Sequence, residues 1–164
     1  MASGPPALAL HEALTGNTGF LLSRMGMAAS RAFAERIAAV GLTPRGWGAL
    51  NVLDKEGAIT QQWLGTCIGM DPSSMVATID ELEAAGLVER RRNPHDRRAH
   101  ALHITAKGRR ALTEGRKVAR RAQEELLAPL DADERRQLHE LLLRLVQGSG
   151  QANVASSSER AATG

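Results

Sequence analysis

Residues 71–108 read DPSSMVATIDELEAAGLVERRRNPHDRRAHALHITAKG, and the first half of this stretch predicts one amphipathic helix. Asp71 suits the cap of the helix, because its carboxylate can accept from free backbone N–H groups, and Pro72 suits the first turn, where no N–H is needed. The apolar stripe of the helix consists of Met75, Ile79 and Leu82. Gly86 then ends the helix, since glycine readily takes the left-handed conformation found there.

The second half of the stretch predicts a two-stranded β-hairpin. Two short runs, LVERRR (87–92) and RAHALHI (98–104), flank the turn-forming residues NPHD. Because consecutive side chains of a strand alternate between its faces, the arginines before the turn do not all point the same way. The turn is surrounded by Arg90, Arg91, Arg92, Arg97 and Arg98. So many guanidinium groups in one place suit a polyanionic partner.

The residues before position 71 complete a helix-turn-helix pattern. Thr43 and Pro44 are typical of a helix start, and Gly57 of its end. Thr60 caps a further helix of about two turns, QQWLGTCI, and Gly69 permits a tight turn into the helix at 71. This order of helices, followed by a basic hairpin, is that of a winged helix-turn-helix, which places its second helix in the DNA major groove.

The C-terminal part predicts two helices and a tail. Thr105 caps a long basic helix that reaches to about Leu127, and Asp131 with Glu134 has the capping-box pattern of a last helix. The last helix carries a stripe of leucines, Leu138, Leu141, Leu142 and Leu145. The small and polar residues 148–164 predict a disordered tail.

The N-terminal residues 7–40 have a helical pattern that breaks near Gly16 and Gly19 and stops at Gly41. We therefore expect a mainly α (α+β) fold, a winged helix-turn-helix with a helical dimerisation region. Its expected parts are an N-terminal helical dimerisation segment (1–41), a DNA-binding lobe (42–108), C-terminal dimerisation helices (105–147) and the disordered tail (148–164).

Charge is distributed unevenly along the chain. Lys and Arg outnumber Asp and Glu by 12 to 3 in residues 86–121, whereas acidic residues prevail by 8 to 5 before this block and by 7 to 4 after it. The local basic block favours double-stranded DNA as a partner over an ordinary solvated face. No apolar run approaches the roughly 18 residues that span a bilayer, and the N-terminus has no signal-peptide pattern, so we expect a cytoplasmic protein without a membrane role.

A motif around the hairpin turn is more specific than the order of elements. Residues 96–99 read Asp-Arg-Arg-Ala, and an apolar strand leads from them to Ile104-Thr105. The pattern resembles the wing signature of the MarR family of transcriptional regulators, with Ile104 in place of the usual leucine, and the resemblance in helix order extends over residues 8–147. It implies that Arg98, with Arg97 beside it, enters the minor groove while Asp96 orients Arg98 by an ion pair. A purely structural role of Asp96 and Arg98 in the hairpin is the alternative.

Three places supply the candidate DNA contacts. In and before the second helix they are Asp71, Pro72, Ser73, Ser74, Met75 and Thr78, of which Met75 suits the core equally well. At the start of the preceding helix, Thr60, Gln61 and Gln62 can donate to phosphate. The hairpin contributes Arg90, Asp96, Arg97 and Arg98. The acidic residues Asp80, Glu81 and Glu83 repel phosphate, so the end of the second helix is expected to turn away from DNA.

The partner and the signal follow from the same fold. A helix-turn-helix regulator reads two half-sites about one DNA turn apart, so we expect a homodimer on a palindromic operator, held by the terminal helices. The family resemblance further implies a repressor that a small-molecule effector releases. His11, Met25 and Trp47 are candidates to line the effector crevice, with an ordinary core role as the alternative for Met25 and Trp47.

Other classes find little support in the sequence. There is no phosphate-binding glycine loop, GxSxG or HExxH motif, so we expect neither an enzyme nor a cofactor. His95, His100 and His103 lack the spacing of a metal site. Cys67 lies in the apolar short helix and is expected to be a buried, inert thiol, with thiol-based redox sensing as the alternative. A protein that coats DNA without sequence preference is the nearest alternative class.

Overall fold

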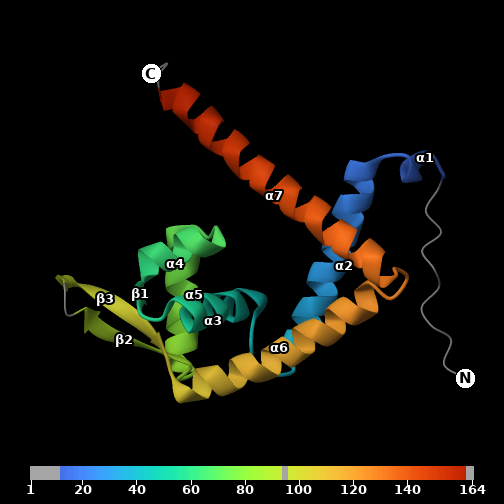
Figure 1. The fold of residues 1–164 in the computed structure, drawn as a ribbon. Helices are drawn as coiled ribbons and strands as arrows, with labels where there is room; N and C mark the ends of the chain where they lie inside the picture. Colours follow the sequence, from blue (N-terminus) through green and yellow to red (C-terminus); the bar gives the residue numbers. More distant parts are fainter. Residues whose placement is uncertain (1–11, 94–95, 162–164) are drawn as a thin grey trace, which may run out of the picture. The chain divides into compact units, whose positions relative to one another are not determined.

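The computed structural model describes residues 12–93 and 96–161, and the side chains of residues 12–92 and 100–148. The chain divides into two compact units, one up to Ala122 and one from Gln123. The first unit contains α1 (Glu12–Thr15), α2 (Thr18–Ala38), α3 (Pro44–Glu56), β1 (Ile59–Thr60), α4 (Gln61–Ile68), α5 (Pro72–Ala84), β2 (Val88–Asn93), β3 (Asp96–Ile104) and most of α6 (Ala106–Leu126). The second unit contains the end of α6 and α7 (Ala132–Ala161) (Figure 1).

Local signals set the helix boundaries where the sequence predicts them. Thr43 Oγ1 accepts from the N–H of Gly46 at 3.0 Å, and Thr60 Oγ1 accepts from the N–H of Trp63 at 3.2 Å. The predicted break near Gly16 is confirmed, because α1 ends before it and Asn17 caps α2. Positive φ angles occur at the predicted helix ends, at Gly41, Gly57, Gly69 and Gly86.

The predicted hairpin is confirmed as an antiparallel pair of strands. Val88 pairs with Ile104 and Arg92 with His100, and the register shifts between Arg92 and Asn93. The short strand β1 pairs with the other edge of β3, so the sheet order is β1-β3-β2 (Figure 1). β1 was not predicted, because two residues show no periodicity and pair only when the tertiary fold brings β3 beside them.

One hydrophobic core lies among α3, α4, α5 and the sheet in the first unit (Figure 1). Its largest fully buried side chains are Ile37, Leu50, Leu53, Leu64, Met75, Ile79, Val88, Leu102 and Leu112. Each such side chain contributes about 1.5–3 kcal/mol when it leaves water. α2 and α6 join this core through Ile37 and Leu112, so the helix-turn-helix is packed against both flanking helices.

The start of α6 lies directly against the turn between α5 and β2. The Thr105 hydroxyl donates to Gly86 O at 2.8 Å, and the Thr105 N–H donates to Leu87 O at 3.0 Å. Thr105 also caps α6, accepting from the N–H of Gly108 at 3.0 Å. A Cβ atom at Gly108 would lie 2.1 Å from Leu87 O, so this close approach requires glycine.

Two arginines of α6 share one carboxylate of α3. Asp54 receives Arg109 Nη1 at one oxygen and Arg116 Nη2 at the other, both at 2.9 Å. Arg116 Nε also donates to Asn51 at 3.1 Å. These contacts join about two turns of α6 to about one turn of α3.

In the second unit, α7 begins with the predicted capping box. The Asp131 N–H donates to Glu134 Oε2 and the Glu134 N–H donates to Asp131 Oδ1, both at 2.9 Å. α7 then continues to Ala161, so it includes residues 148–161, for which the sequence predicts disorder. These residues include no proline, and a helix that is already nucleated can extend one residue at a time.

Candidate DNA-binding surface

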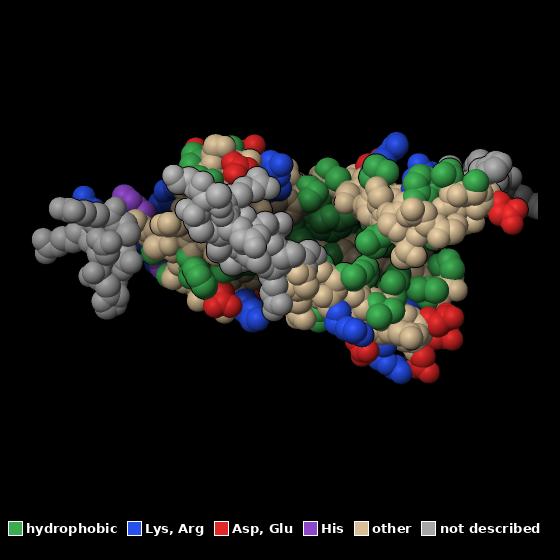
Figure 2. Space-filling view, turned by 90° about the horizontal axis from the view of Figure 1, so that it is seen from above, with side chains coloured by type: hydrophobic (Ala, Val, Ile, Leu, Met, Phe, Trp, Pro, Cys, Tyr) green, Lys and Arg blue, Asp and Glu red, His purple; other side chains and the backbone are tan. Residues whose placement is uncertain are grey.

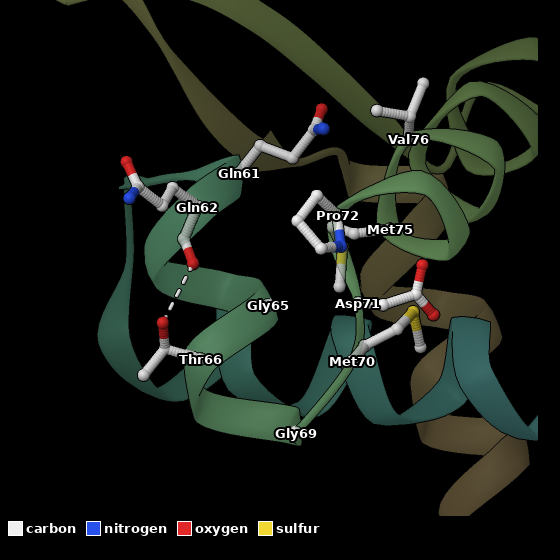
Figure 3. A pocket seen from close by; sticks show the side chains of 10 residues that line it. All are labelled: Gln61, Gln62, Gly65, Thr66, Gly69, Met70, Asp71, Pro72, Met75 and Val76. Atoms are coloured by element: carbon white, nitrogen blue, oxygen red, sulfur yellow. Dashed lines mark hydrogen bonds between the residues drawn. The ribbon is translucent and has the colours of Figure 1, made fainter. Parts of the chain in front are cut away.

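A groove of about 740 Å³ lies between α4 and α5. Gln61, Gln62, Thr66, Pro72 and Val76 are among the residues that line it. In Figure 3, Gln61 and Val76 extend from α4 and α5 at the same end of the groove, on either side of Pro72. The groove exists because Gly69, with φ 65° and ψ 38°, turns the chain sharply between the two helices.

The exposed face of α5 follows a helical repeat and differs from the predicted one. Pro72, Ser73, Val76, Ala77 and Asp80 are exposed, at spacings of three and four residues. Thr78, a predicted contact, is only 4% exposed, which corrects its prediction. Met75, for which the sequence left a core role and a DNA contact equally open, is 1% exposed and belongs to the core. Because the stripe of Met75, Ile79 and Leu82 packs into the core, Val76 and Ala77 face outward. The apolar stripe in the sequence therefore already indicated which face of α5 is buried.

Asp71 caps the N-terminus of α5, and Pro72 is its first residue. Asp71 Oδ1 accepts from the N–H of Ser74 at 2.9 Å and from the hydroxyl of Ser73 at 2.7 Å. Hydrogen bonds from the side chain and N–H of Ser74, and then from Ser73, hold the pKa of Asp71 well below its ordinary value. The carboxylate is therefore ionised at neutral pH, where it caps the helix and orients Ser73.

The predicted phosphate donors lie at the start of α4. Thr60 caps the helix with its side-chain oxygen, and Gln62 is exposed. Gln61 is half-buried, and its Oε1 lies 3.4 Å from Arg90 Nη2. The side chains of Gln61 and Gln62 both line the groove, so the structure brings them to the same surface as Val76.

Arg90 has a different environment from the one the sequence predicts. Its guanidinium lies 2.6 Å from Asp80 Oδ1 and also forms an ion pair with Glu83, both on α5. Its backbone N–H donates to Glu83 Oε1 at 3.2 Å. Arg90 is thus engaged within the protein, and its predicted contact with DNA stays untested. The carboxylates of Asp80 and Glu83, which are expected from the sequence to repel phosphate, join α5 to β2 through Arg90.

Replacing Arg90 with methionine is expected to lower the free energy of unfolding by about 1–2 kcal/mol. The Arg90 side chain is only 27% exposed, and its loss leaves the carboxylates of Asp80 and Glu83 without their cation. Chemical denaturation followed by circular dichroism measures the change. Arg91→Met is the matched control, since Arg91 is 61% exposed and pairs with Glu89 on its own strand. Equal losses in the two variants would contradict the role of Arg90 in joining strand and helix.

Three candidate contacts occupy the hairpin tip. Asp96, Arg97 and Arg98 belong to β3, but their side chains lie outside the described residues. The strand β3 that carries them is anchored to the lobe by the buried residues Leu102 and Ile104. Their DNA contacts, and the ion pair between Asp96 and Arg98, stay predictions.

Two of the three candidates for an effector crevice lie within the described residues, and the crevice itself stays a prediction. His11 lies outside the described residues, and Met25 is 51% exposed on α2. Trp47 packs against the core and meets Phe33 edge to face, with ring centroids 5.2 Å apart. Its Nε1 is buried and, within the described part of the chain, has no hydrogen-bond partner.

The structure also corrects the prediction for Cys67, which is exposed. α4 buries Leu64 and Gly65, so Cys67 falls on another side of the helix. Among residues 12–92 and 100–148, no group of three His, Cys, Asp or Glu side chains could hold a metal ion. No helix in the described ranges is long and apolar enough to cross a membrane.

The fold and this surface define a winged helix-turn-helix protein. The MarR family model matches residues 40–99. A putative transcriptional regulatory protein for the hcr operon of Thauera aromatica is 35% identical over 148 residues, which are 88% of this chain and 89% of that protein. The chain belongs to the MarR family and is a DNA-binding transcriptional regulator, and proteins of this family are not enzymes.

Two solved structures extend the similarity to most of the chain. The transcriptional repressor CouR, bound to a 23-mer DNA duplex, has a TM-score of 0.77 and 32% identity, and the match covers 85% of this chain and 99% of CouR. A probable transcriptional regulator from Pseudomonas aeruginosa has a TM-score of 0.73 and 33% identity, with 80% and 98% covered. The predicted winged-helix fold class is confirmed.

Proposed function

We propose that the protein is a repressor that binds a palindromic operator as a homodimer, with α5 in the major groove and the arginine wing in the minor groove. The observation that carries this proposal is the joining of the hairpin to α5 by Arg90, Asp80 and Glu83. Because these contacts hold strand and helix together, the exposed face of α5 and the wing can engage one duplex as a single rigid unit.

The charges of the chain support this docking. Of the five arginines around the hairpin turn, Arg90 is used within the protein, which leaves the arginines nearer the tip for DNA. A narrow minor groove has the strongest negative potential and attracts such guanidinium groups. The hydroxyl of Ser73 and the amide of Gln62 are exposed on the same lobe and suit phosphate or base edges. CouR, which is similar over most of its length, is a repressor bound to DNA, and this favours the same role here.

A homodimer would account for the apolar surface of α7. Leu141, Leu143 and Val146 are 46%, 47% and 69% exposed, and none of the described side chains of α7 is buried. Figure 2 shows several hydrophobic side chains, drawn in green, at the surface of the face that it presents. Burying such residues in a second copy would remove them from water. A dimer would also present two copies of α5 to the two half-sites of a palindrome.

Replacing Leu141 with glutamate is expected to raise the dissociation constant of the dimer about a hundredfold, because an unpaired charge at an apolar interface costs about 3 kcal/mol. Sedimentation velocity over a range of concentrations measures this change. Gln147→Glu adds the same charge at an exposed position of α7 and is expected to remain dimeric. A wild-type chain that sediments as a monomer at micromolar concentration would contradict the homodimer.

A small-molecule effector would release the operator if it bound more tightly to a conformation that does not fit DNA. The buried Nε1 of Trp47, which lacks a partner in the described part of the chain, supports a site where a ligand supplies an acceptor. Met25 and His11 are the other proposed lining residues. As a DNA-binding regulator of transcription, the protein would work in the cytoplasm.

Selection of bound fragments from genomic DNA tests the proposed function. The full-length chain is expected to bind one palindromic sequence about a thousandfold or more tightly than random DNA at physiological salt. A reporter gene behind that sequence is expected to be expressed less when the protein is present. Equal affinity for all duplexes would instead favour the alternative of a protein that coats DNA.

A further inference from the structure

The recognition helix has an unusual chemistry for reading DNA. α5 (PSSMVATIDELEA) contains no lysine and no arginine, and its charged residues are all acidic. The commonest specific contact in the major groove, an arginine that binds O6 and N7 of guanine, is therefore absent from this helix. Sequence has to be read here by hydroxyl groups or by apolar contact.

Val76 is placed for apolar contact. It is 44% exposed, while the apolar residues of the helix at positions 75, 79 and 82 are buried. Within α5, all of which the structure describes, it is the one large apolar side chain that is exposed. It lies on the groove between α4 and α5, at the end where Gln61 extends, and Ala77 is exposed beside it (Figure 3).

The side chain of Val76 is also held in position before it binds. A valine in a helix is confined almost entirely to one χ1 rotamer, so little side-chain entropy is lost on contact. One turn further along α5, the carboxylate of Asp80 is paired with Arg90 at 2.6 Å. This pairing offsets the negative charge of Asp80 and lets an apolar contact of Val76 approach a base edge.

We propose that Val76, with Ala77 beside it, recognises the C5 methyl group of thymine in the operator. Of the four bases, only thymine presents a methyl group in the major groove, and apolar side chains are its usual partners. The specificity of α5 is then for A·T pairs and not for guanine. This inference rests on the proposed function, since it names how the same helix selects its half-site.

The test replaces thymine by deoxyuridine in the duplex selected from genomic DNA, one position at a time and in both half-sites. This change removes a methyl group and leaves base pairing intact. Binding of the full-length chain is measured by fluorescence anisotropy at one salt concentration. At one thymine of each half-site, the loss of a buried methyl is expected to weaken binding about fourfold per half-site.

Three variants locate the contact. Val76→Ala is expected to bind the thymine duplex more weakly and to show no further loss with deoxyuridine. Val76→Thr, in which a hydroxyl replaces one of the two γ-methyl groups at nearly the same shape, is expected to lose only part of this selectivity, because its remaining methyl can still contact thymine. Both are expected to keep wild-type thermal unfolding, because the position is partly exposed. Val118→Ala, which truncates a half-buried valine on α6, is the matched control and is expected to keep the wild-type response to deoxyuridine.

The outcomes separate the two proposals. If the wild-type chain selects an operator but no thymine-to-deoxyuridine change weakens its binding, the contact to thymine is wrong and the regulator stands. The same holds if Val76→Ala retains the full response to deoxyuridine. If the chain selects no sequence over random DNA, the proposed function itself fails.

Discussion

Replacing Gly108 with alanine is expected to lower the free energy of unfolding by about 3 kcal/mol, the largest stability change among the substitutions considered. The new Cβ would lie 2.1 Å from Leu87 O, 3.1 Å from Leu87 C and 2.9 Å from Ile104 Cγ1. Two of these atoms belong to backbone and cannot rotate away. The first turn of α6 would therefore have to move away from Leu87. This movement would break the hydrogen bonds from Thr105 to Gly86 O and Leu87 O.

Thermal unfolding measures this loss, which corresponds to a melting temperature lower by about 10 °C for a chain of this size. Gly48→Ala is the matched control, because Gly48 also lies within a helix but a Cβ there would meet nothing within 4 Å. That variant is expected to gain up to about 1 kcal/mol from the better helix propensity of alanine. Gly108→Ala with wild-type stability would mean that α6 does not begin against Leu87.

Replacing Arg98 with alanine is expected to weaken operator binding about ten- to a hundredfold without unfolding the protein. The physical reason is the proposed insertion of its guanidinium into a minor groove of strong negative potential, a contact worth about 1–3 kcal/mol. Titration of the labelled operator at several salt concentrations measures the effect. The slope of log affinity against log salt is expected to fall in magnitude by about one for each lost phosphate contact.

Arg31→Ala is the control for a simple loss of charge, since Arg31 is 84% exposed on α2 and pairs with Glu35 one turn away. It is expected to bind the operator as the wild type does. Arg98→Lys is expected to bind with intermediate affinity, because it keeps the charge but loses the planar guanidinium. Unchanged affinity of Arg98→Ala at physiological salt would remove the wing from the mechanism.

The sequence could predict most helix boundaries because they depend on residues close together in the chain. A capping oxygen bonds an N–H two or three residues away, as at Thr43, Thr60 and Asp71. Glycine stops a helix through its own φ angle, as at Gly57 and Gly86. The family motif at residues 96–105 could likewise be recognised from the sequence alone.

Predictions about single side chains in the site were less accurate. Thr78 was expected at the DNA, yet it is buried, and Cys67 was expected to be buried, yet it is exposed. Arg90 was expected to reach DNA, yet it pairs with Asp80 and Glu83. The apolar stripe of α5 already indicated its buried face, whereas the surroundings of Cys67 and Arg90 depend on other elements and were not visible in the local pattern.

From its order of residues alone, then, this chain specified where its helices start and stop, that a basic hairpin follows two short helices, and which family it resembles. The packed structure alone decided that β1 joins the sheet, that Cys67 is exposed, and that acidic residues of α5 pair with Arg90 of the hairpin. The physical reason is range. Caps and glycine turns act over a few residues, whereas burial and ion pairing depend on which distant elements meet.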